Sequence, residues 1–139
     1  MKIIIHSLKE VPEKTKEFLQ LLEESGEKKI AFSGKMGAGK TTFINELIKA
    51  MGAVSEGSSP TFSIVDEHYT LNYGAINHFD FYRIENEEEV YDIGIEEYLS
   101  DDSFCFMEWP EKVENVLSNQ CLWVNLSESD GIRTLEFDL

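Results

Sequence analysis

A glycine-rich loop between an apolar run and a helical pattern constrains this chain more than any other feature. Residues 34–41 match G-x-x-x-x-G-K-[ST] in full through Gly34, Gly39, Lys40 and Thr41, with Gly37 as a further permissive position. Glycines accept positive φ angles and let an anion approach the main chain, so successive backbone N–H groups can surround a phosphate. A flexible turn between a strand and a helix is the alternative. The full match favours a phosphate-binding loop.

The segments on either side have the structure that such a loop requires. Residues 29–33 are typical of a short buried strand, and a helical stripe of apolar residues begins after Thr41. Gly52 lies at the position that ends this helix. We therefore expect Lys40, an exposed loop cation, to reach the β- and γ-phosphates of a nucleotide, and the Thr41 hydroxyl to be a hard oxygen ligand for Mg²⁺.

Length and charge limit the class of partner. The 139 residues predict a single domain, residues 1–139, that is large enough to bury a core. The formal net charge of −15 argues against nucleic-acid binding by this chain alone, because phosphate contacts need clustered Lys and Arg. This charge suits a partner with a basic face, although solubility alone also explains it.

The cysteines and the N-terminus favour a cytoplasmic protein. Cys105 and Cys121 lie in apolar strand-like runs without the spacing of a metal site, so we expect reduced core residues. The apolar stretch near Met1 is too short for a signal peptide, and no segment approaches the length of a membrane span.

Periodicity and turn residues predict the other elements. Strands are expected at residues 2–6, 62–69, 75–82, 103–107, 121–126 and 132–139, and helices from Pro12 to Gly26 and over residues 85–100 with a break at Gly94. Turns at residues 72–74 and 129–131 make two antiparallel hairpins. The fold class expected is α/β, a P-loop NTPase-like three-layer domain with a mixed parallel and antiparallel central sheet.

Two carboxylates are candidates for the chemistry beside the loop. Strand alternation places His78 and Asp80 on one face, and Glu108 ends an apolar strand where an open α/β sheet carries its ligand site. Each acid also has a purely structural interpretation, Asp80 as a hydrogen-bonded edge-strand acid and Glu108 as a strand-end acid. We expect His78 to be structural, because Mg²⁺ prefers oxygen ligands. Trp109 is expected to pack near the site, with a contact between its ring and a neighbouring loop as the alternative.

Two features that the sequence lacks bear on which nucleotide is bound and which reaction is catalysed. No N-K-x-D stretch is present to recognise guanine, which favours ATP. Arg83 and Arg133 are the only arginines, whereas a small-molecule kinase holds a second anionic substrate and closes a basic lid over both.

Four motifs together closely resemble the TsaE family. They are G-x-x-G-A-G-K-T-T at residues 34–42, S-P-T-F at 59–62, H-F-D-F-Y-R at 78–83 and E-W-P at 108–110. The resemblance implies a bacterial P-loop ATPase that takes part in forming threonylcarbamoyladenosine at position 37 of tRNAs reading ANN codons. It also implies the TsaB–TsaD complex as partner, with tRNA contacted only indirectly and no membrane.

The resemblance also implies roles for individual residues. The phosphate cradle would consist of Gly37, Ala38, Gly39, Lys40, Thr41 and Thr42, with Thr41 on Mg²⁺, and a switch-like segment of Ser59, Pro60 and Thr61. Asp80 would be the acid needed for hydrolysis, Glu108 the magnesium-side or water-orienting acid, and Arg133 a residue that approaches the nucleotide. A P-loop kinase for a small metabolite and a non-catalytic nucleotide sensor are the alternatives.

Overall fold

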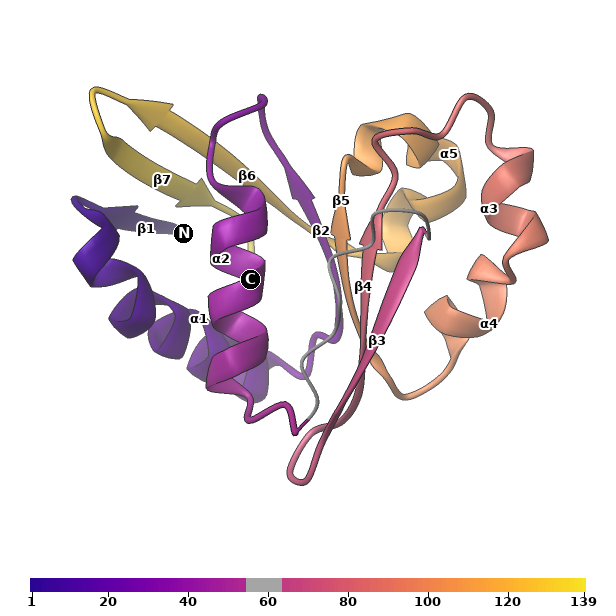
Figure 1. The fold of residues 1–139 in the computed structure, drawn as a ribbon, viewed down its shortest axis with the longest axis horizontal. Helices are drawn as coiled ribbons and strands as arrows, with labels where there is room; N and C mark the ends of the chain where they lie inside the picture. The colour runs from indigo at the N-terminus through magenta and orange to yellow at the C-terminus, as the bar shows by residue number, and fades with distance from the viewer. Residues whose placement is uncertain (55–63) are drawn as a thin grey trace.

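Seven strands form one sheet in a computed structural model that describes residues 1–54 and 64–139. The strands are β1 (Lys2–Ile5), β2 (Lys29–Ser33), β3 (Val65–Thr70), β4 (Gly74–Asp80), β5 (Phe104–Glu108), β6 (Leu122–Ser129) and β7 (Ile132–Glu136). Their order in the sheet is β1-β7-β6-β2-β5-β4-β3, which places β2 in the middle (Figure 1).

The sheet mixes both strand orientations, as the sequence predicts. β2 pairs parallel with β5 on one side and β6 on the other, and β4 continues the parallel part beyond β5. The pairs β1–β7, β6–β7 and β3–β4 are antiparallel. A strand covered on both faces needs apolar residues at consecutive positions, and the first four residues of β2 are all buried.

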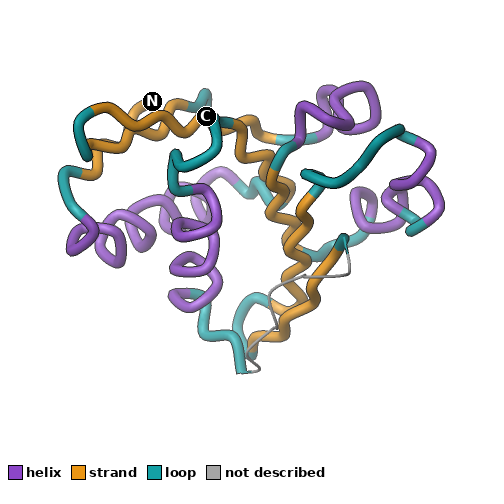
Figure 2. The backbone as a smooth tube through the Cα atoms, turned by 45° about the horizontal axis from the view of Figure 1, so that its top comes forward, coloured by secondary structure: helices purple, strands orange, loops and turns teal. Residues whose placement is uncertain are grey.

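Helices cover the sheet on two sides. α1 (Val11–Ser25) and α2 (Lys40–Ala50) pack on one face, and the shorter α3 (Glu88–Asp92), α4 (Ile95–Ser100) and α5 (Glu114–Leu117) on the other (Figures 1 and 2). Pro12 lies in the first turn of α1, and Gly26 ends it in the left-handed conformation. Short 3₁₀ segments at Leu8–Glu10, Pro110–Val113 and Ser118–Gln120 complete the described elements. The three-layer α/β class is confirmed.

Several element boundaries differ from the prediction, among them the end of β6 at Ser129 instead of residue 126 and the end of β7 at Glu136 instead of residue 139. β4 ends at Asp80, so Tyr82 lies beyond the strand, because the Asp80 carboxylate accepts the Tyr82 N–H at 3.0 Å and turns the chain. The acidic segment becomes helical only at Glu88, and Gly94 separates its two short helices as expected. β5 runs one residue further than predicted and includes Glu108.

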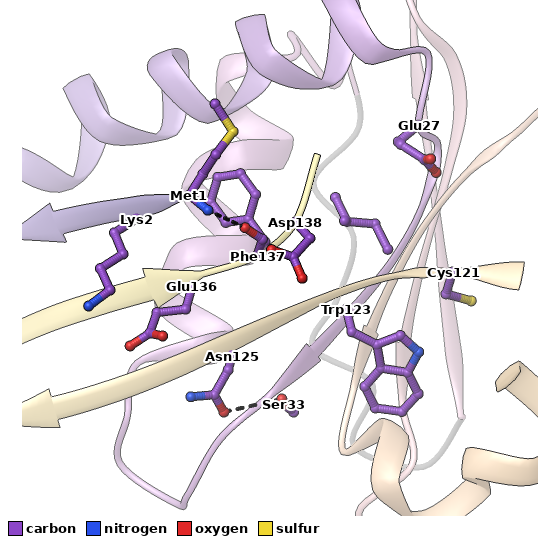
Figure 3. Close-up of a pocket in the computed structure, with 11 residues that line it drawn as sticks. Met1, Lys2, Glu27, Ser33, Cys121, Trp123, Asn125, Glu136, Phe137 and Asp138 are labelled. Carbon is purple, nitrogen blue, oxygen red and sulfur yellow. Dashed lines mark hydrogen bonds between the residues drawn. The ribbon is translucent and has the colours of Figure 1, made fainter. Parts of the chain in front are cut away.

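The outer face of the β1–β7–β6 end of the sheet holds a pocket of about 520 Å³ (Figure 3). A row of register partners, Lys2, Glu136, Asn125 and Ser33, crosses this face. Cys121 also lines the pocket, and burial raises the pKa of its thiol to about 12. Both cysteines are free, as expected. Among the described residues, none that was predicted for the nucleotide site lines this pocket.

Candidate nucleotide site

The loop predicted to bind phosphate lies between the C-terminal end of β2 and the start of α2. Gly34 has φ of 148°, and a Cβ there would come within 2.3 Å of the Leu126 carbonyl oxygen of β6. Gly39 has φ of 97°, and a Cβ there would lie 2.7 Å from Arg133 Nε. These two positions therefore require glycine both for the backbone conformation and for the space beside it.

The N-terminus of α2 presents its first backbone N–H groups without a side-chain cap. Its N-cap is Gly39, which has no side-chain oxygen to accept them. The helix dipole adds partial positive charge at the same end. A loop of this shape in front of an uncapped helix is suited to bind phosphate.

Lys40 is buried, in contrast to the exposed loop cation expected from the sequence. The residue is 5% exposed; its Nζ lies 3.5 Å from the centroid of the Trp109 ring and donates a hydrogen bond to the Gly34 carbonyl. Burial lowers the pKa of Lys40, although nearby carboxylates, Glu111 foremost, oppose this. Trp109 thus makes the contact with a neighbouring loop that was the alternative to simple packing, because its ring contacts the cation of the loop.

We expect ATP binding to change the fluorescence of Trp109. Phosphate oxygens would compete with the indole ring for the Lys40 ammonium, and the emission of an indole responds to a charge that moves at its face. A Trp123→Phe variant leaves Trp109 as the one tryptophan, so a titration of this variant with ATP reports on Trp109 alone. An unchanged spectrum at saturating ATP, with binding established by calorimetry, would contradict the prediction.

Glu108 is held by two hydrogen bonds at the mouth of the loop. Its Oε1 accepts the Thr41 hydroxyl at 2.5 Å, and its Oε2 lies 2.7 Å from His78 Nε2. Burial raises the pKa of Glu108, but the hydrogen bonds from His78 and Thr41, helped by the charges of His78 and Lys40, outweigh it and keep the pKa below its ordinary value. Glu108 is therefore a carboxylate at neutral pH, in contact with the residue predicted to ligate Mg²⁺.

Asp80 lies beside Glu108 in the neighbouring strand. The two residues are register partners across the parallel β4–β5 pair. Asp80 is half-buried, and one of its carboxylate oxygens accepts the Tyr82 N–H. The structure thus brings together the two acids that the sequence singled out, and the role of each in hydrolysis stays a prediction.

Arg133 reaches the loop from β7. Its side chain packs on Gly39, and its Nε is buried without a hydrogen-bond partner among the described residues. Its contact with a nucleotide stays a prediction. Thr42 follows Thr41 in the first turn of α2, and Ala38 is buried in the loop. The switch-like residues Ser59, Pro60 and Thr61 lie outside the described residues.

A cavity of about 590 Å³ runs along the outer side of the loop. Its walls include Gly37, Trp109, Glu111 and residues 125–128 of β6. The Thr41–Glu108–His78 hydrogen bonds lie outside its lining. The candidate site therefore combines a cradle for phosphate with an adjacent cavity open to a larger group.

The partners in two contacts of this site are not specified by the sequence. The Trp109–Lys40 contact and the His78–Glu108 hydrogen bond each join residues far apart in the chain. The position of His78 on the same strand face as Asp80 was the available signal, but it does not specify a partner in the next strand.

Comparison with protein-family models matches residues 5–135 to the family described as "Threonylcarbamoyl adenosine biosynthesis protein TsaE". The chain belongs to the TsaE family. The similar curated proteins carry the name "tRNA threonylcarbamoyladenosine biosynthesis protein TsaE". That of Haemophilus influenzae is 36% identical over 107 residues, which cover 77% of this chain and 67% of that protein. That of Rickettsia typhi is 34% identical over 134 residues, or 94% of this chain and 91% of that protein.

A solved structure has a similar fold. The crystal structure of YdiB from Bacillus subtilis superposes with a TM-score of 0.67 at 26% identity, over 99% of this chain and 83% of that one. In the part of this TsaE chain that the structure describes, no helix has both the length and the apolar character needed to cross a membrane.

Proposed function

We propose that this TsaE-family chain is a Mg²⁺-dependent ATPase required for forming threonylcarbamoyladenosine at position 37 of tRNAs that read ANN codons. The observation that carries the proposal is the hydrogen bond from Thr41 to Glu108 at the mouth of the phosphate-binding loop. It joins the two oxygen donors that a nucleotide-bound magnesium ion needs, in a family named for this modification.

The donor set fits Mg²⁺ held together with a nucleotide. No group of three or more His, Cys, Asp or Glu side chains that could hold a metal exists among residues 1–54 and 64–139. Mg²⁺ commonly uses one or two protein oxygens, substrate phosphates and water, and Thr41 and Glu108 provide this kind of ligand. The ion would neutralise charge on the β- and γ-phosphates.

The other residues of the site would position the reactants. Backbone N–H groups of the loop and the Lys40 ammonium would bind the phosphates, which requires Lys40 to leave the Trp109 ring. Asp80 and Glu108 lie side by side at the strand ends, where a carboxylate can orient the attacking water. Arg133 is the cation nearest the loop on the β7 side and would approach the nucleotide there.

The charge of the chain supports action through a partner. A net charge of −15 favours docking onto a basic surface of the TsaB–TsaD complex over direct binding of tRNA, and the cytoplasm is the location we propose. Hydrolysis by the chain alone should be slow, because phosphoryl transfer is commonly accelerated by an additional arginine that a partner can provide. A metabolite kinase is disfavoured by the scarcity of arginine, and a non-catalytic sensor by the presence of both acids.

ATP hydrolysis measured with and without TsaB, TsaD and tRNA tests the proposal. We expect slow hydrolysis by the chain alone and a clear increase when the partner proteins are added. ATP binding without hydrolysis under every combination would favour the sensor. Transfer of the γ-phosphate to a small metabolite would favour the kinase.

We expect ATP to bind in preference to GTP, because the sequence lacks the N-K-x-D stretch that recognises guanine. Displacement of a fluorescent ATP analogue by unlabelled ATP and GTP measures this preference. Equal competition by the two nucleotides would contradict it.

A further inference from the structure

We propose that His78 is a positioning residue that fixes the Glu108 carboxylate so that its Oε1 faces Thr41 and the nucleotide-bound Mg²⁺. The inference rests on the proposed function, because it assigns a task to His78 within the same site. It goes beyond the sequence analysis, which expected only a structural histidine.

The His78 and Glu108 side chains form a buried pair. Each is 4% exposed, and His78 Nε2 lies 2.7 Å from Glu108 Oε2. His78 comes from β4, where its register partner in β5 is Phe106, two residues before Glu108. The imidazole thus reaches forward along the sheet and contacts the carboxylate oxygen that Thr41 does not contact.

The direction of this hydrogen bond follows from the chemistry of the acceptor. An ionised carboxylate only accepts hydrogen bonds, so His78 must carry a proton on Nε2 and donate it. Thr41 donates to the other oxygen. With both oxygens bound, the carboxylate cannot rotate about its last side-chain bond without breaking one of the two hydrogen bonds.

Loss of the His78 donor would remove the hydrogen bond that holds Glu108 Oε2. It would thereby also change the position of Oε1, the oxygen that we propose faces the metal. Glu108 Oε2 would be buried without its partner, and the carboxylate would turn to recover one. Hydrogen-bond partners of metal-ligating groups typically contribute about 10- to 100-fold to metal affinity or activity.

A second buried histidine, His68, provides a comparison for His78. His68 lies in β3 on the same face of the sheet and is 7% exposed. Its Nδ1 has no hydrogen-bond partner among the described residues. His68 thus provides a matched control for the removal of a buried imidazole.

Three amide substitutions test the inference. His78→Gln keeps an N–H donor at about the reach of imidazole Nε2, whereas His78→Asn is one methylene shorter and cannot reach Glu108. His68→Asn makes the same chemical change at the control position. Isothermal titration calorimetry with the non-hydrolysable analogue AMP-PNP, first in EDTA and then at increasing MgCl₂, separates nucleotide binding from the effect of Mg²⁺.

We expect all variants to bind AMP-PNP like the wild type in EDTA. The Mg²⁺ concentration that gives half of the Mg²⁺-induced change in AMP-PNP affinity should be about 10- to 100-fold higher for His78→Asn than for the wild type. The same concentration for His78→Gln and His68→Asn should be close to that of the wild type. The same ordering should appear in the Mg²⁺ dependence of ATP hydrolysis. Equal Mg²⁺ dependence of His78→Asn and the wild type would overturn the inference and leave the proposed function intact. A wild-type protein that does not respond to Mg²⁺ would instead overturn the proposed function, and the inference with it.

A spectroscopic measurement covers the case in which His78→Asn does not fold. In ¹⁵N-histidine spectra of the wild type, the His78 Nε2–H should exchange slowly with water, and its resonance should shift in Glu108→Gln. A rapidly exchanging Nε2–H, or a resonance that Glu108→Gln leaves in place, would overturn the inference without any substitution at His78.

Discussion

Lys40→Ala should weaken ATP binding by about 10- to 100-fold while the fold is retained, because a charged hydrogen bond to phosphate contributes roughly 1.5–3 kcal/mol. The ammonium contacts the Gly34 carbonyl and the ring of Trp109, which is only partly buried at the edge of an apolar cluster. Calorimetry measures the affinity, and circular dichroism with thermal unfolding tests the fold.

Lys35→Ala is the matched control for this substitution. Lys35 lies in the same loop and carries the same charge, but its side chain is exposed, and it is not the lysine of the G-K-[ST] motif. We expect only a small loss of affinity. Unchanged ATP affinity of a folded Lys40→Ala protein, or an equal loss in both variants, would argue against the phosphate-loop assignment.

Glu108→Gln should bind ATP yet hydrolyse it about 10²- to 10⁴-fold more slowly, the usual cost of losing a positioned acid or base. Gln keeps the size of Glu and can still accept the Thr41 hydroxyl, but it lacks the negative charge that the metal or the attacking water requires. The substitution does not change the loop N–H groups or Lys40, which we propose bind the phosphates. The rates should be compared in the presence of TsaB and TsaD, because hydrolysis by the chain alone is expected to be slow.

Asp80→Asn is the companion variant for Glu108→Gln, since Asp80 is the register partner of Glu108. If Glu108→Gln turns over ATP at the wild-type rate, Glu108 is only a strand-end acid. In that case Asp80→Asn should show the loss, which would make Asp80 the catalytic carboxylate.

Features that depend on local sequence were predictable. The positive φ angles of the loop before α2 follow from its glycine spacing, and α2 follows from its apolar stripe and the Gly52 after it. The hairpin between β6 and β7 follows from Asp130 and Gly131, which both adopt the positive φ angles that such turns need.

Features that depend on distant strands were not predictable in the same way. The burial of Lys40 depends on Trp109, which arrives from the end of β5. The bond between His78 and Glu108 depends on the parallel register of β4 and β5, and strand alternation specifies only a face. The place of β6 between β7 and β2 likewise follows from packing, because no local pattern encodes strand order.

The pairing of β1 with β7 has a consequence for the synthesis of this protein. β1 pairs along its whole length with β7, so during synthesis this pair cannot form until residues 132–136 have emerged from the ribosome. The glycine-rich loop also depends on a strand that is synthesised later, because Gly34 packs on the Leu126 carbonyl of β6. Until residues 122–136 have emerged, the nascent chain lacks the support that shapes this loop. Under the proposed function, ATP would therefore stabilise the protein only after these strands have formed, and it would not guide the early stages of folding.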